Sequence, residues 1–224
     1  MSFRCLILDL DGTIVDSHRY TFAAFRHACA PFRLEPEDAE IYAAFGPYER
    51  AILAQLLPTS QVDSAYVRLQ AYYREHVTTL AVHPAMPALL DDCRAAGVRC
   101  GLFTGRGSDS TQMILARLDL ARAFDAVVAG DDVARPKPSG DGVRRLLATL
   151  DCQPGEAIVV GDSRLDLEAA LDAGTAAAVA TWYVWSRTPP MEAAALLLQH
   201  PDELRPHLGL APAAAAADND EDNP

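Results

Sequence analysis

Short apolar runs and segments of helical periodicity alternate along most of the chain. Five runs have the length of a strand and few polar positions, and they cover residues 3–10, 98–103, 126–129, 157–160 and 176–181. Between them, apolar residues recur at i, i+3, i+4 and i+7, for example over residues 143–150, which is the spacing of an amphipathic helix. The runs are continuously apolar rather than alternating, as is typical of parallel strands that are buried on both faces. The pattern predicts an α/β fold with helices on both faces of a parallel sheet of five or slightly more strands.

The segment that follows the first run departs from this alternation. Its apolar residues keep only helical spacing, as at Val62, Ala65 and Leu69, and no run in it is typical of a strand. At the other end, an alanine run followed by "DNDEDNP" has the composition of a disordered tail. The predicted parts are a Rossmann-like α/β core of residues 1–15 and 84–210, an inserted helical domain of residues 16–83 and a disordered acidic tail of residues 211–224.

The composition excludes several classes of partner. Of the 224 residues, 50% are hydrophobic and 22% are charged, which is ordinary for a globular protein. The formal net charge of -12 argues against nucleic acid, because a phosphate backbone requires clustered Lys and Arg. No apolar run is long enough to cross a bilayer, and the first residues do not resemble a signal peptide. The five cysteines show no paired metal spacing, so we expect a reduced, cytoplasmic protein. We also expect this protein to be a monomer or a homodimer.

Polar side chains follow four of the predicted strands, at the edge where ligands bind in open α/β sheets. They comprise four carboxylates, one hydroxyl and one ammonium, from Asp9, Asp11, Thr104, Lys137, Asp162 and Asp166. Burying unpaired carboxylates is prohibitively unfavourable, so a cation is expected beside them. Carboxylate oxygens suit Mg²⁺, which commonly also binds a substrate phosphate. The sequence therefore predicts a magnesium site that acts on a phosphate compound.

Each of these residues also has a purely structural interpretation. Thr104 could end a strand in a turn, and Lys137 could be a solvated loop lysine, although it stands between two prolines. Asp162 could be the N-cap of a helix that starts near Ser163, because aspartate favours that position. The role of Asp166 stays open between a structural and a functional one.

Four motifs give the chain a family resemblance. They are "DLDGT" with Asp9 and Asp11, "FTG" with Thr104, "RPKP" with Lys137, and "GDSRLDLEAALDAG" with Asp162 and Asp166. In this order, over residues 3–185, they resemble the haloacid dehalogenase-like hydrolase superfamily, and most of all its phosphoglycolate phosphatase-like branch. One departure is Gly105, which stands where that branch commonly has Asn.

The resemblance implies a mechanism and assigns roles to the residues. Asp9 is expected to be the nucleophile that forms an aspartyl phosphate, and Asp11 to be the general acid and base. Mg²⁺ is expected on Asp9, Asp11 (through its backbone carbonyl) and Asp162, and Asp166 is expected to orient metal waters or Lys137. Catalytic and phosphate contacts are expected from three positions, Thr104, Gly105 and Lys137.

The resemblance also implies the substrate, which is expected to be a small phosphomonoester similar to phosphoglycolate. It further implies that the inserted domain of residues 16–83 is the helical cap of the family. The alternatives are a pyrophosphatase, or a sugar-phosphate or nucleotide phosphatase, on the same core. Asp11 disfavours a dehalogenase, and Thr21, where a histidine is expected, disfavours a β-phosphoglucomutase. Arg26, together with Tyr48 and Arg50 of "FGPYER", is a candidate for setting substrate choice, and Arg50 is the residue predicted to bind the substrate.

Overall fold

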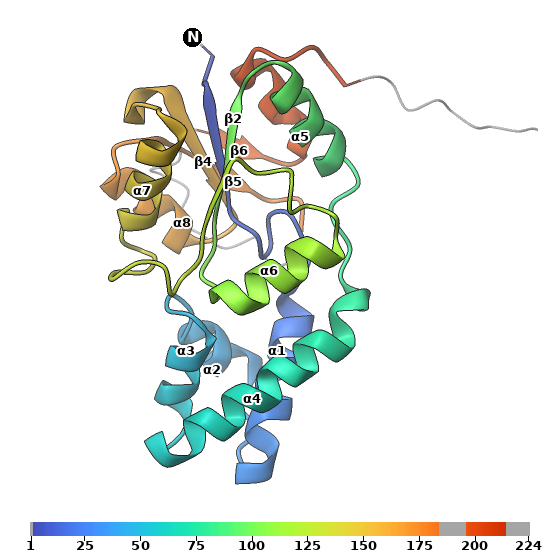
Figure 1. Cartoon of the computed structure of the whole chain (residues 1–224), viewed down its shortest axis with the longest axis vertical. Helices are drawn as coiled ribbons and strands as arrows, with labels where there is room; N and C mark the ends of the chain where they lie inside the picture. Colours follow the sequence, from blue (N-terminus) through green and yellow to red (C-terminus); the bar gives the residue numbers. More distant parts are fainter. Residues whose placement is uncertain (1, 184–195, 214–224) are drawn as a thin grey trace, which may run out of the picture.

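A parallel sheet of six strands runs through the computed structural model, which describes residues 2–183 and 196–213 (Figure 1). The strands follow the order β3-β2-β1-β4-β5-β6. Their bounds are β1 Cys5–Leu8, β2 Arg99–Phe103, β3 Ala126–Val128, β4 Ala157–Gly161, β5 Ala176–Ala180 and β6 Leu196–Leu198. Strand β1 is central, since Ile7 is in register with both Gly101 of β2 and Val159 of β4. The predicted α/β class is confirmed, and β6 is one strand more than the five runs indicate.

Helices cover both faces of the sheet, as the continuously apolar strands predict. Successive residues of β1 point to opposite sides, so Cys5 and Ile7 join one apolar cluster while Leu6 and Leu8 join the other. Helices α7 (Asp141–Leu150) and α8 (Arg164–Asp172) pack on the first side. The second side is covered by α5 (Met86–Ala95), α6 (Ser108–Arg117) and the 3-10 helix η6 (Pro201–Leu208). A further short 3-10 helix, η3 (Pro154–Glu156), precedes β4.

Four further helices lie beyond the carboxyl ends of the strands, at the end of the molecule opposite the N-terminus (Figure 1). Their bounds are α1 His18–Cys29, α2 Asp38–Ala43, α3 Glu49–Leu56 and α4 Thr59–His76, with the 3-10 turns η1 Ala30–Phe32 and η2 Val77–Thr79. We call α1–α4 the helical segment. Fully buried apolar side chains such as Phe25, Leu53 and Tyr73 hold α1, α3 and α4 together. Where the chain enters and leaves the segment, an isolated antiparallel β-bridge pairs Val15 with Val82.

Other expectations concern the thiols, the membrane and the tail. All five cysteines are buried and have free thiols. Among the described helices, none combines the length and the apolar character that crossing a bilayer requires. Residues 211–213 of the predicted tail are exposed, whereas 214–224 lie outside the described residues.

The packing of α7 on the sheet leads to a stability prediction for Gly142→Ala. A Cβ at position 142 would lie 2.2 Å from the Phe103 ring of β2, which is fully buried and has little room to move. We expect the substitution to lower the free energy of unfolding by about 1–3 kcal/mol in urea titrations, despite the higher helix propensity of alanine. Gly155→Ala is the control, because nothing lies within 4 Å of that Cβ. Unchanged or increased stability of Gly142→Ala would contradict this view of the packing.

Candidate active site

A cavity of about 310 Å³ is enclosed by the carboxyl ends of the strands and by the helical segment. Its charged lining comes mainly from the core, and most of its apolar lining comes from the helical segment. The lining includes Asp9, Asp11, Gly105, Arg106, Lys137, Asp162 and Asp166 on the first side and Phe25, Tyr42, Phe45, Glu49, Ile52 and Tyr73 on the second. The structure therefore brings most of the predicted site residues to one place.

The turn after β1 depends on a glycine. The N–H of Asp9 still donates to the carbonyl of Val160 at 2.9 Å, so Asp9 directly continues the sheet. The chain then turns sharply at Gly12, whose φ of +75° is in the left-handed region. A Cβ there would also lie 2.0 Å from Oδ2 of Asp162. Glycine at this position of "DLDGT" therefore lets the turn after β1 lie against the carboxylate that follows β4.

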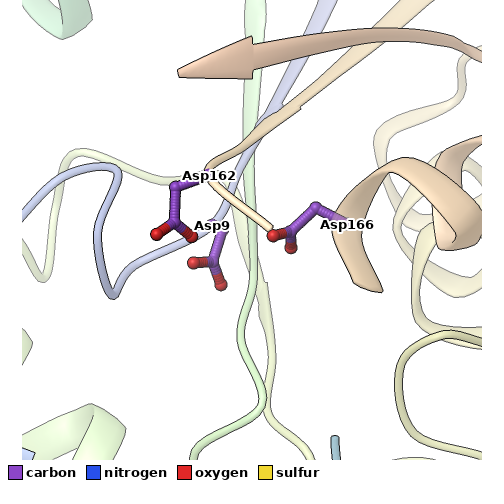
Figure 2. Close-up of side chains that lie close together, drawn as sticks. All are labelled: Asp9, Asp162 and Asp166. Atoms are coloured by element: carbon purple, nitrogen blue, oxygen red, sulfur yellow. The ribbon is translucent and has the colours of Figure 1, made fainter. Parts of the chain in front are cut away.

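Three carboxylates converge at the floor of the cavity, from Asp9, Asp162 and Asp166 (Figure 2). One oxygen of each lies within 4.8 Å of the others, and all three residues are buried. Nζ of Lys137 donates to Asp9 at 2.7 Å and to Asp166 at 2.5 Å. A Cβ at Gly161 would lie 2.2 Å from Cγ of Asp166, so glycine at the end of β4 leaves room for this group.

Helix α8 positions Asp166 through its own N-terminus. Ser163 is the N-cap, and its N–H and hydroxyl donate to Oδ2 of Asp166 at 3.1 and 2.5 Å. The other carboxylate oxygen remains for Lys137. Asp162 precedes the N-cap, so the alternative in which Asp162 itself caps the helix does not apply.

The floor of the cavity carries more negative than positive charge. Burial raises the pKa of Asp9 to about 7, with Asp166 and Asp11 adding to the effect and Lys137 opposing it. Burial and the neighbouring Asp166 and Asp9 raise the pKa of Asp162 well above its usual value. Burial opposes the charge of Lys137, but Asp166 and Asp9 outweigh it and raise the pKa of that ammonium. Three buried carboxylates facing one ammonium are a set of hard oxygen donors, and they fit a divalent cation such as Mg²⁺.

The side chain of Asp11 is bound by other residues than the side chain of Asp9. Its carboxylate is held by Arg106, with Nε at 2.7 Å from Oδ2 and Nη2 at 2.7 Å from Oδ1, and it also accepts from Ser17. Burial would raise the pKa of Asp11, but Arg106 reverses this, and the pKa is lowered. The Asp11 side chain is thus separate from the three-carboxylate cluster, and its predicted metal contact concerns the backbone carbonyl.

Arg106 and Glu49 are buried charged residues of the cavity to which the sequence patterns assign no role. Arg106 is 5% exposed and Glu49 is 3% exposed. Arg106 follows Thr104 and Gly105 directly, and Glu49 directly precedes Arg50 in "FGPYER". The signal that could have identified them is their position, since Arg106 stands at a strand end and Glu49 stands in "FGPYER". These positions do not indicate that the two residues lie close together.

The remaining predicted residues are placed as follows. Thr104 is fully buried at the end of β2, and its Oγ1 accepts from the N–H of Arg106 at 3.2 Å. Gly105 lines the cavity next to it. Arg50 and Arg26 form half-exposed ion pairs with Asp63 and Asp38, and neither belongs to the described residues that line the cavity. The structure does not bring Arg50, the predicted substrate ligand, to the site.

Comparison with known proteins places the chain in a family. The family model for haloacid dehalogenase-like hydrolases matches residues 6–180, so the chain belongs to the haloacid dehalogenase-like hydrolase family. Pyrophosphatase PpaX of Bacillus velezensis is 30% identical over 182 residues, which are 80% of this chain and 83% of that protein. The phosphoglycolate phosphatase of Aquifex aeolicus is 30% identical over 183 residues, 80% of this chain and 85% of that protein. The predicted family and the class of hydrolase are confirmed.

Solved structures share the fold. CbbY from Rhodobacter sphaeroides in complex with phosphate superposes with a TM-score of 0.78 at 22% identity, covering 88% of this chain and 93% of that one. A predicted phosphoglycolate phosphatase from Haemophilus somnus gives a TM-score of 0.77 at 20% identity, with coverage of 88% and 94%. The Rossmann-like architecture is therefore that of the family.

The double pairing of Lys137 leads to a second stability prediction. Lys137→Met leaves Asp9 and Asp166 buried without their shared cation, which is expected to lower the free energy of unfolding by about 3–5 kcal/mol at neutral pH. Adding Asp166→Asn to this variant removes one of the uncompensated charges and should restore part of the loss in urea titrations. Arg135→Ala is the control, because its pair with Asp141 is exposed and screened by water, so that its loss should change the stability little. A Lys137→Met protein as stable as the parent would contradict this account.

Proposed function

We propose that the protein is a Mg²⁺-dependent phosphatase that hydrolyses a small phosphomonoester through an aspartyl phosphate on Asp9. The observation that carries the proposal is the buried cluster of Asp9, Asp162 and Asp166 around Lys137 at the floor of the cavity. Membership of the haloacid dehalogenase-like hydrolases, and relatives named as phosphatases, support it.

Asp9, Asp162 and the backbone carbonyl of Asp11 would hold the metal ion. When bound, Mg²⁺ supplies the positive charge that lets a phosphate dianion approach the buried carboxylates. The ammonium of Lys137 donates to Asp9, and it can also bind a phosphate oxygen as charge develops. Asp166 holds Lys137 in place for this contact.

Asp9 and Asp11 divide the chemistry between them. A carboxylate oxygen of Asp9 attacks phosphorus, and the bond between phosphorus and the leaving oxygen breaks. Asp11 would give a proton to that oxygen, and its carboxyl group can carry this proton only while it is released from Arg106, because their ion pair lowers the pKa of Asp11. In the second step a water attacks the aspartyl phosphate, its proton passes to Asp11, and the bond to Asp9 breaks, so that phosphate leaves and Asp9 is restored.

The helical segment completes the site as a cap. Phe25, Phe45 and Ile52 form an apolar wall opposite the carboxylates, and this wall excludes bulk water and contacts the leaving group. We propose that residues 16–83 form this cap and that residues 1–15 and 84–210 form the core. The Aquifex aeolicus relative favours phosphoglycolate as the ester, whereas the PpaX relative favours pyrophosphate. A panel containing both compounds and common sugar phosphates, assayed with Mg²⁺, decides between them.

The first functional prediction concerns the metal. Phosphate release from an aryl phosphate should stop when EDTA is added and return with excess Mg²⁺, because Asp9 and the substrate dianion repel each other without a cation between them. Ca²⁺ is the matched control, since it accepts looser coordination and should restore less activity. Full turnover in excess chelator would remove the metal from the proposal.

The second functional prediction separates the two aspartates of "DLDGT". Asp9→Asn removes the nucleophile, so no phosphoenzyme should form in a rapid-quench assay. Asp11→Asn keeps the backbone carbonyl but cannot transfer a proton, so esters with poor leaving groups should be hydrolysed about 10²–10⁴-fold more slowly. An activated aryl phosphate should still phosphorylate Asp9 in this variant, and the phosphoenzyme should then decay slowly. Normal turnover of a sugar phosphate by Asp11→Asn, or full activity of Asp9→Asn, would contradict these assignments.

A further inference from the structure

Arg106 joins Asp11 to the helical segment. Besides its two contacts to the Asp11 carboxylate, Nη2 of Arg106 donates to Oγ1 of Thr21 in α1 at 2.6 Å. The guanidinium carbon lies 4.8 Å above the centre of the Tyr73 ring of α4. The arginine is 5% exposed, so its contacts are shielded from water and their geometry is constrained by packing.

Glu49 fastens the same segment to the core beside Arg106. It is the first residue of α3, and its carboxylate accepts from the N–H of Gly107 at 2.8 Å and from the hydroxyl of Ser110 at 2.5 Å. These two groups belong to the N-terminus of core helix α6, where a negative charge is favourable. Oε1 of Glu49 also lies 3.7 Å from Nη1 of Arg106, an atom that forms no hydrogen bond to any described residue.

These contacts make the orientation of Asp11 depend on the helical segment. The Arg106 side chain is bound on one side by Asp11 of the core and on the other by Thr21 and Glu49 of the segment. If the segment moves away, Arg106 loses the partners that fix its guanidinium plane. A planar guanidinium that holds a carboxylate through two parallel hydrogen bonds fixes both its distance and its rotation.

We propose that Arg106, held by Thr21 and Glu49, is a positioning residue that orients Asp11 to accept the proton of the attacking water only when the helical segment is seated on the core. This inference rests on the proposed function, in which Asp11 accepts the proton of the attacking water. In that step the water oxygen bonds to phosphorus, its proton passes to a carboxylate oxygen of Asp11, and the bond between phosphorus and Asp9 breaks. The arrangement couples the exclusion of bulk water to the readiness of the base.

Arg106→Lys is the central test, because lysine keeps the charge but cannot bind the carboxylate through two parallel hydrogen bonds. The probe is an activated aryl phosphate with Mg²⁺, measured by rapid quench. We expect hydrolysis of the phosphoenzyme to slow by about 10²-fold, the effect of misplacing a reacting group by about 1 Å, while its formation changes much less. The phosphoenzyme should therefore accumulate. A loss that falls on its formation, or an increase in KM alone, would overturn the proposal.

The double variant Arg106→Lys with Asp11→Asn shows whether Arg106 acts through Asp11. If it does, the double variant should turn over within about 2-fold of Asp11→Asn alone, because the two residues then form one unit. If the turnover of the double variant falls by the product of the two single losses, Arg106 acts on the substrate directly and the proposal is wrong. If Asp11→Asn by itself hydrolyses its phosphoenzyme normally, the proposed role of Asp11 fails first, and this inference fails with it.

Two more variants separate positioning from stability. Arg205→Lys alters an equally buried arginine, which is paired with Asp92 and Asp202 at 2.7 Å and does not line the cavity, so it should shift thermal unfolding without phosphoenzyme accumulation. Glu49→Gln weakens the attachment at α6 with little change of shape, and it should cause the same accumulation as Arg106→Lys to a smaller degree. Accumulation in Arg205→Lys, or none in Glu49→Gln, would contradict the coupling.

Discussion

The arrangement of the site depends on one constraint, the burial of more negative than positive charge at the carboxyl edge of the sheet. Asp9, Asp11, Glu49, Asp162 and Asp166 face the cavity from several elements and are at most a quarter exposed. Removing carboxylates from water without partners is too unfavourable for a protein of ordinary stability. The chain therefore places buried cations between them. An excess of carboxylates remains, and it makes the floor of the cavity suitable for a metal ion. Burial, together with this excess, raises the pKa of Asp9 and of Asp162.

Two cations divide the carboxylates into separate groups. Lys137 binds Asp9 and Asp166, and Arg106 binds Asp11 and lies near Glu49. Asp9 and Asp11 stand two residues apart and would share one face if β1 continued. The turn at Gly12 instead sends the two side chains to different partners, because its positive φ redirects the chain immediately after β1. Two identical carboxyl groups thereby acquire opposite pKa shifts, upward for Asp9 because of burial and downward for Asp11 because of Arg106.

The sequence predicts the core well because burial leaves a local signal. Strands β1–β5 coincide with continuously apolar runs, and the motif residues follow them in the order in which the sheet brings them together. Strand β6 is only three residues long and ends the apolar run "AAALLL", whose alanines and leucines suit a helix as well as a strand, so the run alone does not identify it. Arg50 and Glu49 show the limit of the method. The two are charged neighbours at the start of α3, but only the fold decides that Glu49 turns inward onto α6 while Arg50 turns outward to Asp63.

The two sides of the cavity differ in chemistry, and this difference has a consequence for the family. Among the described lining residues, the core contributes most of the charged groups, whereas the helical segment contributes apolar side chains such as Phe25, Phe45 and Ile52 beside polar ones such as His18, Thr21 and Glu49. Apolar walls discriminate weakly between ligands of similar size, because one methylene changes binding by only about 1–3 kcal/mol. Two relatives at the same 30% identity, one named a pyrophosphatase and the other a phosphoglycolate phosphatase, are compatible with this division. Since Arg106 and Glu49 connect the two sides, a change in the helical segment that suits a new leaving group must also preserve the contacts that orient Asp11. Under the proposed function, substrate choice and proton transfer are therefore not independent in this chain, although they are carried by different elements.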